Sequence, residues 1–197
     1  KIDFYNPSDL DTLKKKINKK TKLIFMESPA SLTFEVEDVS EIIKIAKKKK
    51  IITMLDNSWA TPFYFSPINI GIDISILAAT KYISGHADTM LGLITVKNEK
   101  LFLKIKDTAV NLGDSPGPQE CYLSLRGLRT LSTRLEQHRS NALKIARLLE
   151  SNDKVSKVFH PALPKNENYS LWNKYFTGST GLFSFILKEQ SKNKVFK

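Results

Sequence analysis

A strand–helix–strand order in the first third of the chain restricts its fold more than any other feature. The apolar runs at 22–26 and 51–55 predict two short strands. Between them, Asp38 and Glu41 resemble a capping box that begins a helix. That helix would bury one apolar face, made of Val39, Ile42, Ile43 and Ala46. This order predicts a βαβ unit, and therefore a parallel sheet with a right-handed crossover.

The same alternation continues along the chain and predicts an α/β fold with helices on both faces of a mostly parallel sheet. After about residue 97 the pattern changes, and helical spacing dominates the middle of the chain. In chain order, the other predicted elements are a helix capped by Ser8, strands at 72–77 and 91–96, helical stretches at 100–112 and at 119–151 with a break near Gly127, and strands at 155–159 and 182–187.

Two units of unequal size are expected. Residues 1–151 form the larger α/β part, and residues 152–197 look like the opening of a second, smaller domain. The second stretch is too short to close a hydrophobic core alone, so we expect the chain to be truncated at Lys197. It also begins at Lys1 rather than at methionine, which suggests a missing N-terminus.

The net charge of +11 raises the question of a nucleic-acid partner, and the composition argues against one. Only five of the 31 basic residues are arginine, the residue that makes bidentate contacts to bases. The lysine clusters at 14–16 and 47–50 suit solvated helix faces, and the second also favours the negative end of a helix dipole. We therefore predict no nucleic-acid partner.

Other function classes lack their sequence signals. No apolar run approaches the roughly 18 residues of a membrane span, and no secretory signal is visible. The single cysteine, Cys121, cannot form an internal disulfide, which fits a reducing cytoplasm, and we interpret it as a core residue. His86, His138 and His160 have no metal-ligand spacing, so no metal site is predicted.

Two polar residues stand where predicted buried strands end. Asp56 follows the run 51–55, and Lys81 follows the run 73–77 after three further residues. Because ligands gather at the carboxyl ends of strands in open α/β sheets, both side chains are expected at one edge of the sheet. An amine and a carboxylate together suit pyridoxal 5′-phosphate (PLP), since the amine forms a Schiff base and the carboxylate keeps the ring nitrogen protonated. A lysine whose stem begins in the interior would be desolvated and reactive.

Each of these residues also has an ordinary structural interpretation. Asp56 suits a turn or a helix cap, and Lys81 is one of many lysines. Thr80 offers a hydroxyl either to a phosphate oxygen or to the local backbone, and so does Ser84. We interpret His86 as a loop histidine rather than a proton shuttle.

Several segments carry a recognisable pattern, in the order 25–29, 56–60, 71–75, 78–82, 85–86, 126–131, 160–163 and 176–185. Together they resemble, over essentially the whole chain, the Cys/Met-metabolism family of PLP-dependent enzymes. This resemblance implies the fold type I of aspartate aminotransferase, with a PLP-binding large domain followed by a smaller C-terminal domain.

The resemblance also implies roles for single residues. By similarity, Lys81 is the Schiff-base lysine, Asp56 pairs with the pyridinium nitrogen, and Thr80 contributes to phosphate binding. Arg126 and Arg129 belong to a family motif that we interpret as helix packing and interface rather than catalysis.

Within the family, the chain is most similar to the beta-lyases. Gamma-lyases and gamma-synthases usually carry Glu-Ser-Pro-x-Asn-Pro, whereas Ser31 stands at the asparagine position here, and Trp59 resembles the beta-lyase form. The implied reaction is beta-elimination of cystathionine to homocysteine, pyruvate and ammonia, a transsulfuration step of methionine biosynthesis. A cystathionine or methionine gamma-lyase, or a gamma-synthase, is the alternative.

Some family parts have no match in this chain. Relatives carry, upstream, a glycine-containing phosphate loop and an aromatic residue stacked on the ring, and downstream an arginine that binds the substrate carboxylate. A neighbouring subunit supplies a tyrosine and an arginine, and homotetramers built from dimers are usual. We therefore expect residues 1–197 alone to turn over cystathionine poorly or not at all. A remnant with only a folding or association role is the alternative from another class.

Overall fold

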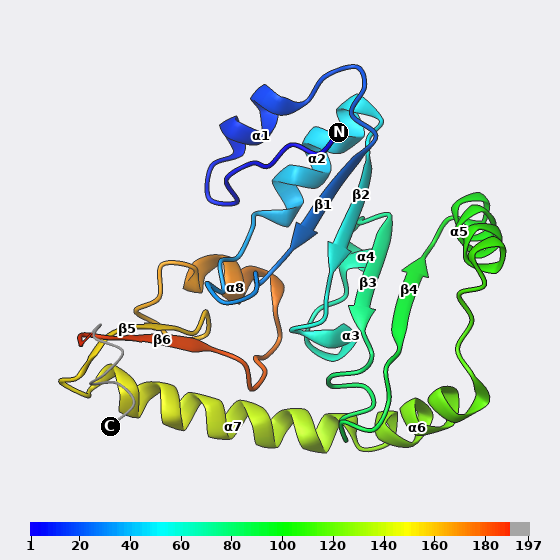
Figure 1. Cartoon of the computed structure of the whole chain (residues 1–197). Coiled ribbons are helices and arrows are strands. Elements are labelled where there is room, and N and C mark those ends of the chain that lie inside the picture. The colour runs from blue at the N-terminus through cyan, green and yellow to red at the C-terminus, as the bar shows by residue number, and fades with distance from the viewer. Residues whose placement is uncertain (190–197) are drawn as a thin grey trace.

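A computed structural model describes residues 1–189, and its centre is a four-stranded sheet in the order β1-β2-β3-β4. The first three strands are parallel neighbours, and β4 pairs antiparallel with β3. Figure 1 shows the first three strands pointing the same way, with their carboxyl ends towards the long helix α7. The sheet is therefore mostly parallel, as predicted. Its strands are β1 (Leu23–Glu27), β2 (Ile52–Asp56), β3 (Ile74–Ala78) and β4 (Gly92–Val96).

The remaining elements lie close to their predicted positions, and the helical break falls between α6 and α7. Three short helices, α3, α4 and α8, were not predicted. The bounds are α1 (Leu10–Lys16), α2 (Val39–Lys49), α3 (Thr61–Tyr64), α4 (Pro67–Ile70), α5 (Glu99–Leu112), α6 (Pro118–Leu128), α7 (Leu131–Glu150), β5 (Val155–Phe159), α8 (Tyr169–Tyr175) and β6 (Ser184–Leu187).

The helix caps confirm one prediction and correct another. Asp38 caps α2, since its carboxylate accepts a hydrogen bond from the Glu41 N–H at 3.4 Å. The cap of α1 is Asp9 and not Ser8, because the Asp9 carboxylate accepts from the Asp11 N–H at 2.9 Å. The four apolar residues predicted to face inward from α2 are all buried.

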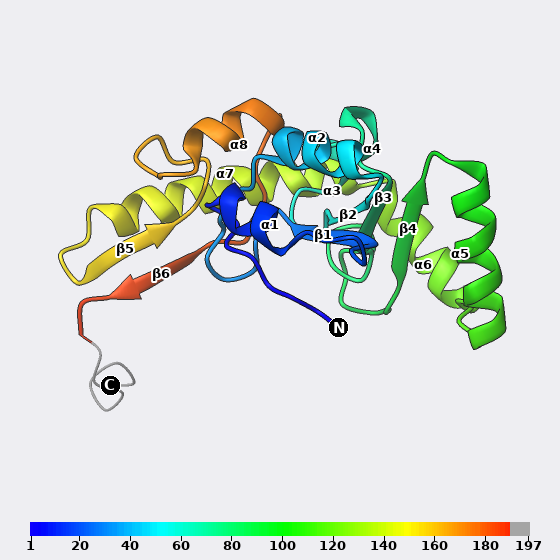
Figure 2. The ribbon, with the colours of Figure 1, turned by 90° about the horizontal axis from the view of Figure 1, so that it is seen from above.

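One face of the sheet forms the core, and the other is left largely uncovered. Along β1, Ile24 and Met26 are buried, whereas Phe25 between them is half exposed. Ile52 of β2 and Ile94 of β4 are exposed as well. Side chains of a strand alternate between faces, so α2 covers one side of the sheet (Figure 2) and no described element covers the other as closely.

The arm formed by β4 and α5 (Gly92–Leu112) contains no buried residue. None of the α5 residues is buried. Figure 1 shows α5 at the far side of β4, away from α2 and α7. Local signals begin and end this helix, since the Asn98 side chain accepts from the Leu101 N–H at 2.9 Å and Gly113 adopts φ +71° beyond its end.

The C-terminal part forms a second sheet and also adds a buried side chain to the hydrophobic core of the main sheet. Strands β5 and β6 pair antiparallel and lie beside α7. Phe176 is buried in the main core, with its ring 5.9 Å from that of Trp59 and 4.7 Å from that of Phe65. The division into domains at 1–151 and 152–197 stays a prediction, and residues 190–197 of the second lie outside the described part.

The lysine clusters and Cys121 all lie at the protein surface. The lysine clusters at 14–16 and 47–50 are exposed, as predicted. Cys121 is exposed too, so its interpretation as a core residue is wrong: α6 buries only Ser124 and Gly127, on another face of the helix. Among residues 1–189, no helix is long and apolar enough to cross a membrane.

Candidate active site

Asp56 ends β2 at the carboxyl edge of the sheet. Its neighbours in register are Glu27 on β1 and Ile76 on β3. The side chain is half-buried, and its Oδ1 accepts a hydrogen bond from the Ser58 N–H at 2.8 Å. Asp56 therefore shapes a local turn, and its carboxylate also lies where a ligand at this edge would meet it.

Lys81 lies in the loop that follows β3, hereafter the Lys81 loop (residues 81–85). The Lys81 N–H donates to the Ala78 carbonyl at 3.2 Å, and the Lys81 carbonyl accepts from the Gly85 N–H at 2.8 Å. The side chain is exposed, so the predicted desolvation of this lysine is absent from the described chain. Within residues 1–189, Nζ of Lys81 has no hydrogen-bond or ion-pair partner, which leaves the amine available to a ligand.

Ser58, which sequence reasoning missed, ties these two segments together. Its hydroxyl oxygen accepts a hydrogen bond from the Ala78 N–H at 2.7 Å. The turn after Asp56 is thereby fixed to the end of β3, three residues before Lys81. The backbone segments that carry both residues therefore leave the same edge of the sheet, and the convergence of their side chains on one ligand stays a prediction.

Thr80 uses its hydroxyl locally. Thr80 Oγ1 accepts from the Leu91 N–H at 2.9 Å and donates to the Leu91 carbonyl at 3.3 Å. The backbone interpretation therefore describes this conformation, and Thr80 would have to release the longer bond to donate to a phosphate. Ser84 is likewise engaged, since its hydroxyl donates to the Thr80 carbonyl at 2.8 Å.

His86 and Arg126 both make contacts at the protein surface. Nδ1 of His86 lies 2.6 Å from the Ser84 carbonyl oxygen, in an exposed loop. Arg126 forms an ion pair with Asp88 at 2.5 Å. Among the described residues, no hydrogen bond or ion pair joins either side chain to Asp56 or Lys81.

Arg134 of α7 is the second residue that sequence reasoning missed. Its guanidinium donates to the carbonyls of Tyr82 and Ile83, at 2.8 and 3.3 Å, and to that of Gly127, at 2.8 Å. The only available signal was an arginine in a chain that otherwise prefers lysine.

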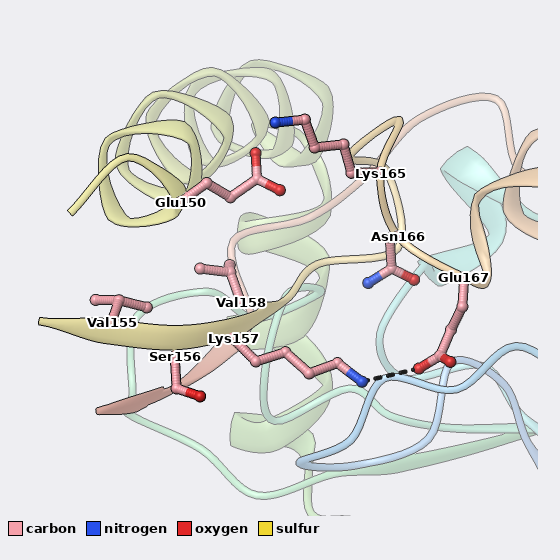
Figure 3. A pocket seen from close by; sticks show the side chains of 8 residues that line it. All are labelled: Glu150, Val155, Ser156, Lys157, Val158, Lys165, Asn166 and Glu167. Atoms are coloured by element: carbon pink, nitrogen blue, oxygen red, sulfur yellow. Dashed lines mark hydrogen bonds and ion pairs between the residues drawn. The ribbon is translucent and has the colours of Figure 1, made fainter. Parts of the chain in front are cut away.

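Two cavities stand apart from this edge. One, of about 320 Å³, lies between β5 and the segment 165–167. Figure 3 shows the Lys157 and Glu167 side chains meeting at its margin, where Nζ and Oε1 are 3.0 Å apart. The other, of about 410 Å³, lies between the N-terminal segment and α8. Neither is lined by Asp56 or Lys81, so the strand-end geometry, and not either cavity, indicates the site.

Two ionisable groups are buried elsewhere in the fold. Glu37 accepts a hydrogen bond from the Tyr5 hydroxyl, and burial raises the pKa of its carboxyl to about 7. Burial lowers the pKa of the His160 imidazole to about 4, and its Nδ1 accepts from the Ala162 N–H at 3.2 Å. No cluster of three or more His, Cys, Asp or Glu side chains among the described residues could hold a metal ion.

Comparisons with known proteins identify relatives of nearly the whole chain. L-alanine/L-glutamate racemase of Wolbachia pipientis wMel is 41% identical over 190 residues, which are 96% of this chain and 46% of that protein. Cystathionine beta-lyase MetC of Escherichia coli (strain K12) is 41% identical over 182 residues, which are 91% of this chain and 46% of that protein. The chain spans about half the length of these relatives.

A solved structure extends the agreement to the fold. Cystathionine gamma-lyase from Lactobacillus plantarum, complexed with L-serine, matches with a TM-score of 0.91 and 31% identity. The match covers 95% of this chain and 49% of that chain. The fold and the family match together define a PLP-dependent enzyme of fold type I.

The model of the Cys/Met metabolism PLP-dependent enzymes matches residues 1–197, and the chain belongs to that family. The residues present suit the cofactor: an amine without a partner among residues 1–189, and a carboxylate at the end of the neighbouring strand. PLP is therefore the cofactor of this protein.

Proposed function

We propose that the protein carrying this chain is a carbon–sulfur beta-lyase that cleaves cystathionine to homocysteine, pyruvate and ammonia. The observation that carries the chemistry is the accessible Lys81 amine, joined to the Asp56 turn through the Ser58–Ala78 hydrogen bond. Ser31 and Trp59, which depart from the gamma-type pattern, support the beta specificity. Similarity to the beta-lyase MetC supports it as well.

The residues at the strand ends then have distinct roles. When bound, PLP supplies an electron sink for the substrate. Lys81 would hold the cofactor through Nζ, the Asp56 carboxylate would keep a proton at the ring nitrogen, and Thr80 would donate to the phosphate after releasing its bond to the Leu91 carbonyl. The Lys81 amine would also take the Cα proton of the substrate.

The overall reaction balances with one water. The bond between Cβ and sulfur breaks, and the sulfur keeps the electron pair. Homocysteine leaves as a thiolate and then gains a proton. The three-carbon enamine that remains takes up water and yields pyruvate and ammonia. No oxidant or reductant is needed.

Covalent binding of the cofactor tests the site. PLP is added to the full-length protein, the visible absorption band is recorded, and borohydride trapping followed by peptide mass analysis locates the attachment. We expect attachment at Lys81 and loss of the band in Lys81→Ala. Lys97→Ala, another exposed lysine after a strand, is the matched control and keeps the band. A band that survives in Lys81→Ala contradicts the assignment.

Product analysis separates the beta-lyase from its relatives. Pyruvate with homocysteine supports the proposal. Release of 2-oxobutyrate, or synthesis of cystathionine, identifies a gamma-type enzyme, which the solved gamma-lyase structure makes the main alternative. Interconversion of L- and D-alanine without keto-acid release identifies a racemase, which the Wolbachia relative brings into consideration.

We also propose a homo-oligomer, built as a dimer of dimers, that works in the cytoplasm. The uncovered apolar residues of the sheet and of α5 support association, since large exposed apolar patches mark interaction surfaces. Light scattering during gel filtration measures the assembly, and a monomeric full-length protein contradicts it. Residues 1–197 alone are expected to be inactive, and ordinary cystathionine turnover by them would refute this.

A further inference from the structure

The backbone of the Lys81 loop is held by one side chain from a distant helix. Arg134 Nη1 donates to the Tyr82 carbonyl at 2.8 Å, and Nη2 donates to the Ile83 carbonyl at 3.3 Å. Tyr82 and Ile83 are buried, and they directly follow Lys81. The backbone on the C-terminal side of the lysine is therefore fixed from α7.

The same guanidinium also holds the junction between α6 and α7. Nη2 of Arg134 donates to the Gly127 carbonyl at 2.8 Å, and Nε donates to the Thr130 hydroxyl at 3.0 Å. Among the described residues, all the acceptors of Arg134 are neutral oxygens, and none is a carboxylate. The charge thus serves backbone carbonyls rather than a salt bridge.

Two glycines allow this close approach. A Cβ at Gly127 would lie 2.1 Å from the Ser84 carbonyl oxygen, and a Cβ at Gly85 would lie 2.1 Å from Arg134 Nη1. Gly85 also has φ +72°, which favours glycine. Loop and helix junction therefore meet backbone to backbone, with the guanidinium in the remaining space.

We propose that Arg134 is a positioning residue: it holds the backbone of the Lys81 loop so that the Lys81 amine faces the cofactor at the edge shared with Asp56. This inference rests on the proposed role of Lys81. A planar guanidinium reaches three carbonyls at once, whereas a lysine ammonium is a point charge on a flexible stem. The position accordingly requires arginine rather than any cation.

The first measurement needs no cofactor. Hydrogen exchange is followed at the amides of Ser84 and Gly85, which donate to the Ala79 and Lys81 carbonyls. Loss of charge-assisted hydrogen bonds should open the loop, and we expect exchange about 10-fold faster in Arg134→Met. Arg147→Met is the matched control, an exposed arginine further along α7, and should exchange like the wild type.

The second measurement follows the cofactor. We expect the Kd for PLP to rise about 10-fold in Arg134→Met, and the pH midpoint of the visible band to move with it, because the amine is held less firmly. Arg134→Lys should fall between the wild type and Arg134→Met. Val158→Ala, buried in the separate cluster beside β5, controls for general loss of stability and should keep both properties.

Each result decides the proposal. Unchanged exchange at Ser84 and Gly85, or a PLP affinity no weaker than that of Val158→Ala, overturns it. Should Arg134→Met fail to fold, the same comparisons are made with Arg134→Lys. A wild-type protein that binds no PLP at Lys81 refutes the proposed function itself, whereas normal binding by both wild type and Arg134→Met refutes only the positioning role.

Discussion

The Lys81 loop follows β3, and the β4–α5 arm begins with the strand that pairs with β3, yet the two segments are held by different means. In the loop, Tyr82, Ile83 and Ser84 are buried, and Arg134 holds its carbonyls. In the arm, no residue of α5 is buried, and Leu103 is 49% exposed. These two segments, which adjoin neighbouring strands, thus differ in whether the rest of the chain fixes their position.

Contacts between distant parts of the sequence set the position of the Lys81 loop. The Tyr82 hydroxyl accepts from the Gly181 N–H at 3.0 Å, a contact across 99 positions of the sequence. The arm is defined by local caps and by its pairing with β3. The lysine therefore depends on long-range packing, whereas the arm is expected to tolerate change.

Removal of one leucine from the core that holds the Lys81 loop and of one from the arm should show the largest contrast. Leu135 of α7 is fully buried in the core that includes Tyr82 and Ile83, so Leu135→Ala is expected to cost about 2–5 kcal/mol of unfolding free energy. Leu103→Ala in α5 should cost well under about 1 kcal/mol, since little apolar area is lost. Urea denaturation measures both, and equal costs would abolish the distinction between the two regions.

Alanine at two glycines should give opposite results. Alanine normally stabilises a helix by about 1 kcal/mol over glycine. Gly127→Ala in α6 should instead cost about 1–3 kcal/mol, because its Cβ meets the Ser84 carbonyl oxygen. At Gly92 of β4 a Cβ meets nothing within 4 Å, so Gly92→Ala should be neutral or slightly stabilising. Thermal unfolding compares them, and a stabilising Gly127→Ala would contradict the tight contact.

Loss of one hydroxyl should separate two tyrosines. Tyr82→Phe removes the acceptor for the Gly181 N–H and should cost about 1 kcal/mol. Tyr122, exposed on α6, is the matched site, and Tyr122→Phe should change the stability by a few tenths of a kcal/mol at most. The same unfolding assay applies, and indistinguishable midpoints would show that the Tyr82 hydroxyl is dispensable.

The smallest effect is expected at the outer side of the segment that joins β3 to β4. Asp88 pairs with Arg126 at the surface, so Asp88→Asn should cost only about 0.2–1 kcal/mol. Added salt should shrink that cost, because exposed charges are screened. A large loss of unfolding free energy that does not depend on salt would contradict this and would indicate that the ion pair behaves like a buried contact.

The positions where the strands end could be predicted from the sequence. The long-range hydrogen bonds of Ser58 and Arg134, which hold the following segments, could not. Apolar runs fixed where β2 and β3 stop, and thereby brought Asp56 and Lys81 to one edge. The hydrogen bond from Arg134 to the Tyr82 carbonyl spans 52 positions, and no local pattern announces it. The Ser58 hydroxyl acts across 20 positions in the same way.

The wrong predictions for Lys81 and Cys121, and the unpredicted helix α8, each have a local cause. The chain turns after Thr80, so that Tyr82 points inward and Lys81 outward, and an apolar strand before the lysine does not reveal this turn. Cys121 was misplaced because α6 presents little apolar pattern and buries only Ser124 and Gly127. Helix α8 was missed because it has seven residues, none of them buried, in a stretch marked by prolines.

The buried carboxyl of Glu37 links folding to acidity. An ordinary glutamate has a pKa of 4.5, and here burial raises the pKa to about 7. Between these two values the native chain binds more protons than the unfolded chain does. This contribution to stability is complete below pH 4.5 and is lost as the pH rises through 7. Alkali, rather than mild acid, should therefore loosen the attachment of the N-terminal segment that Tyr5 anchors.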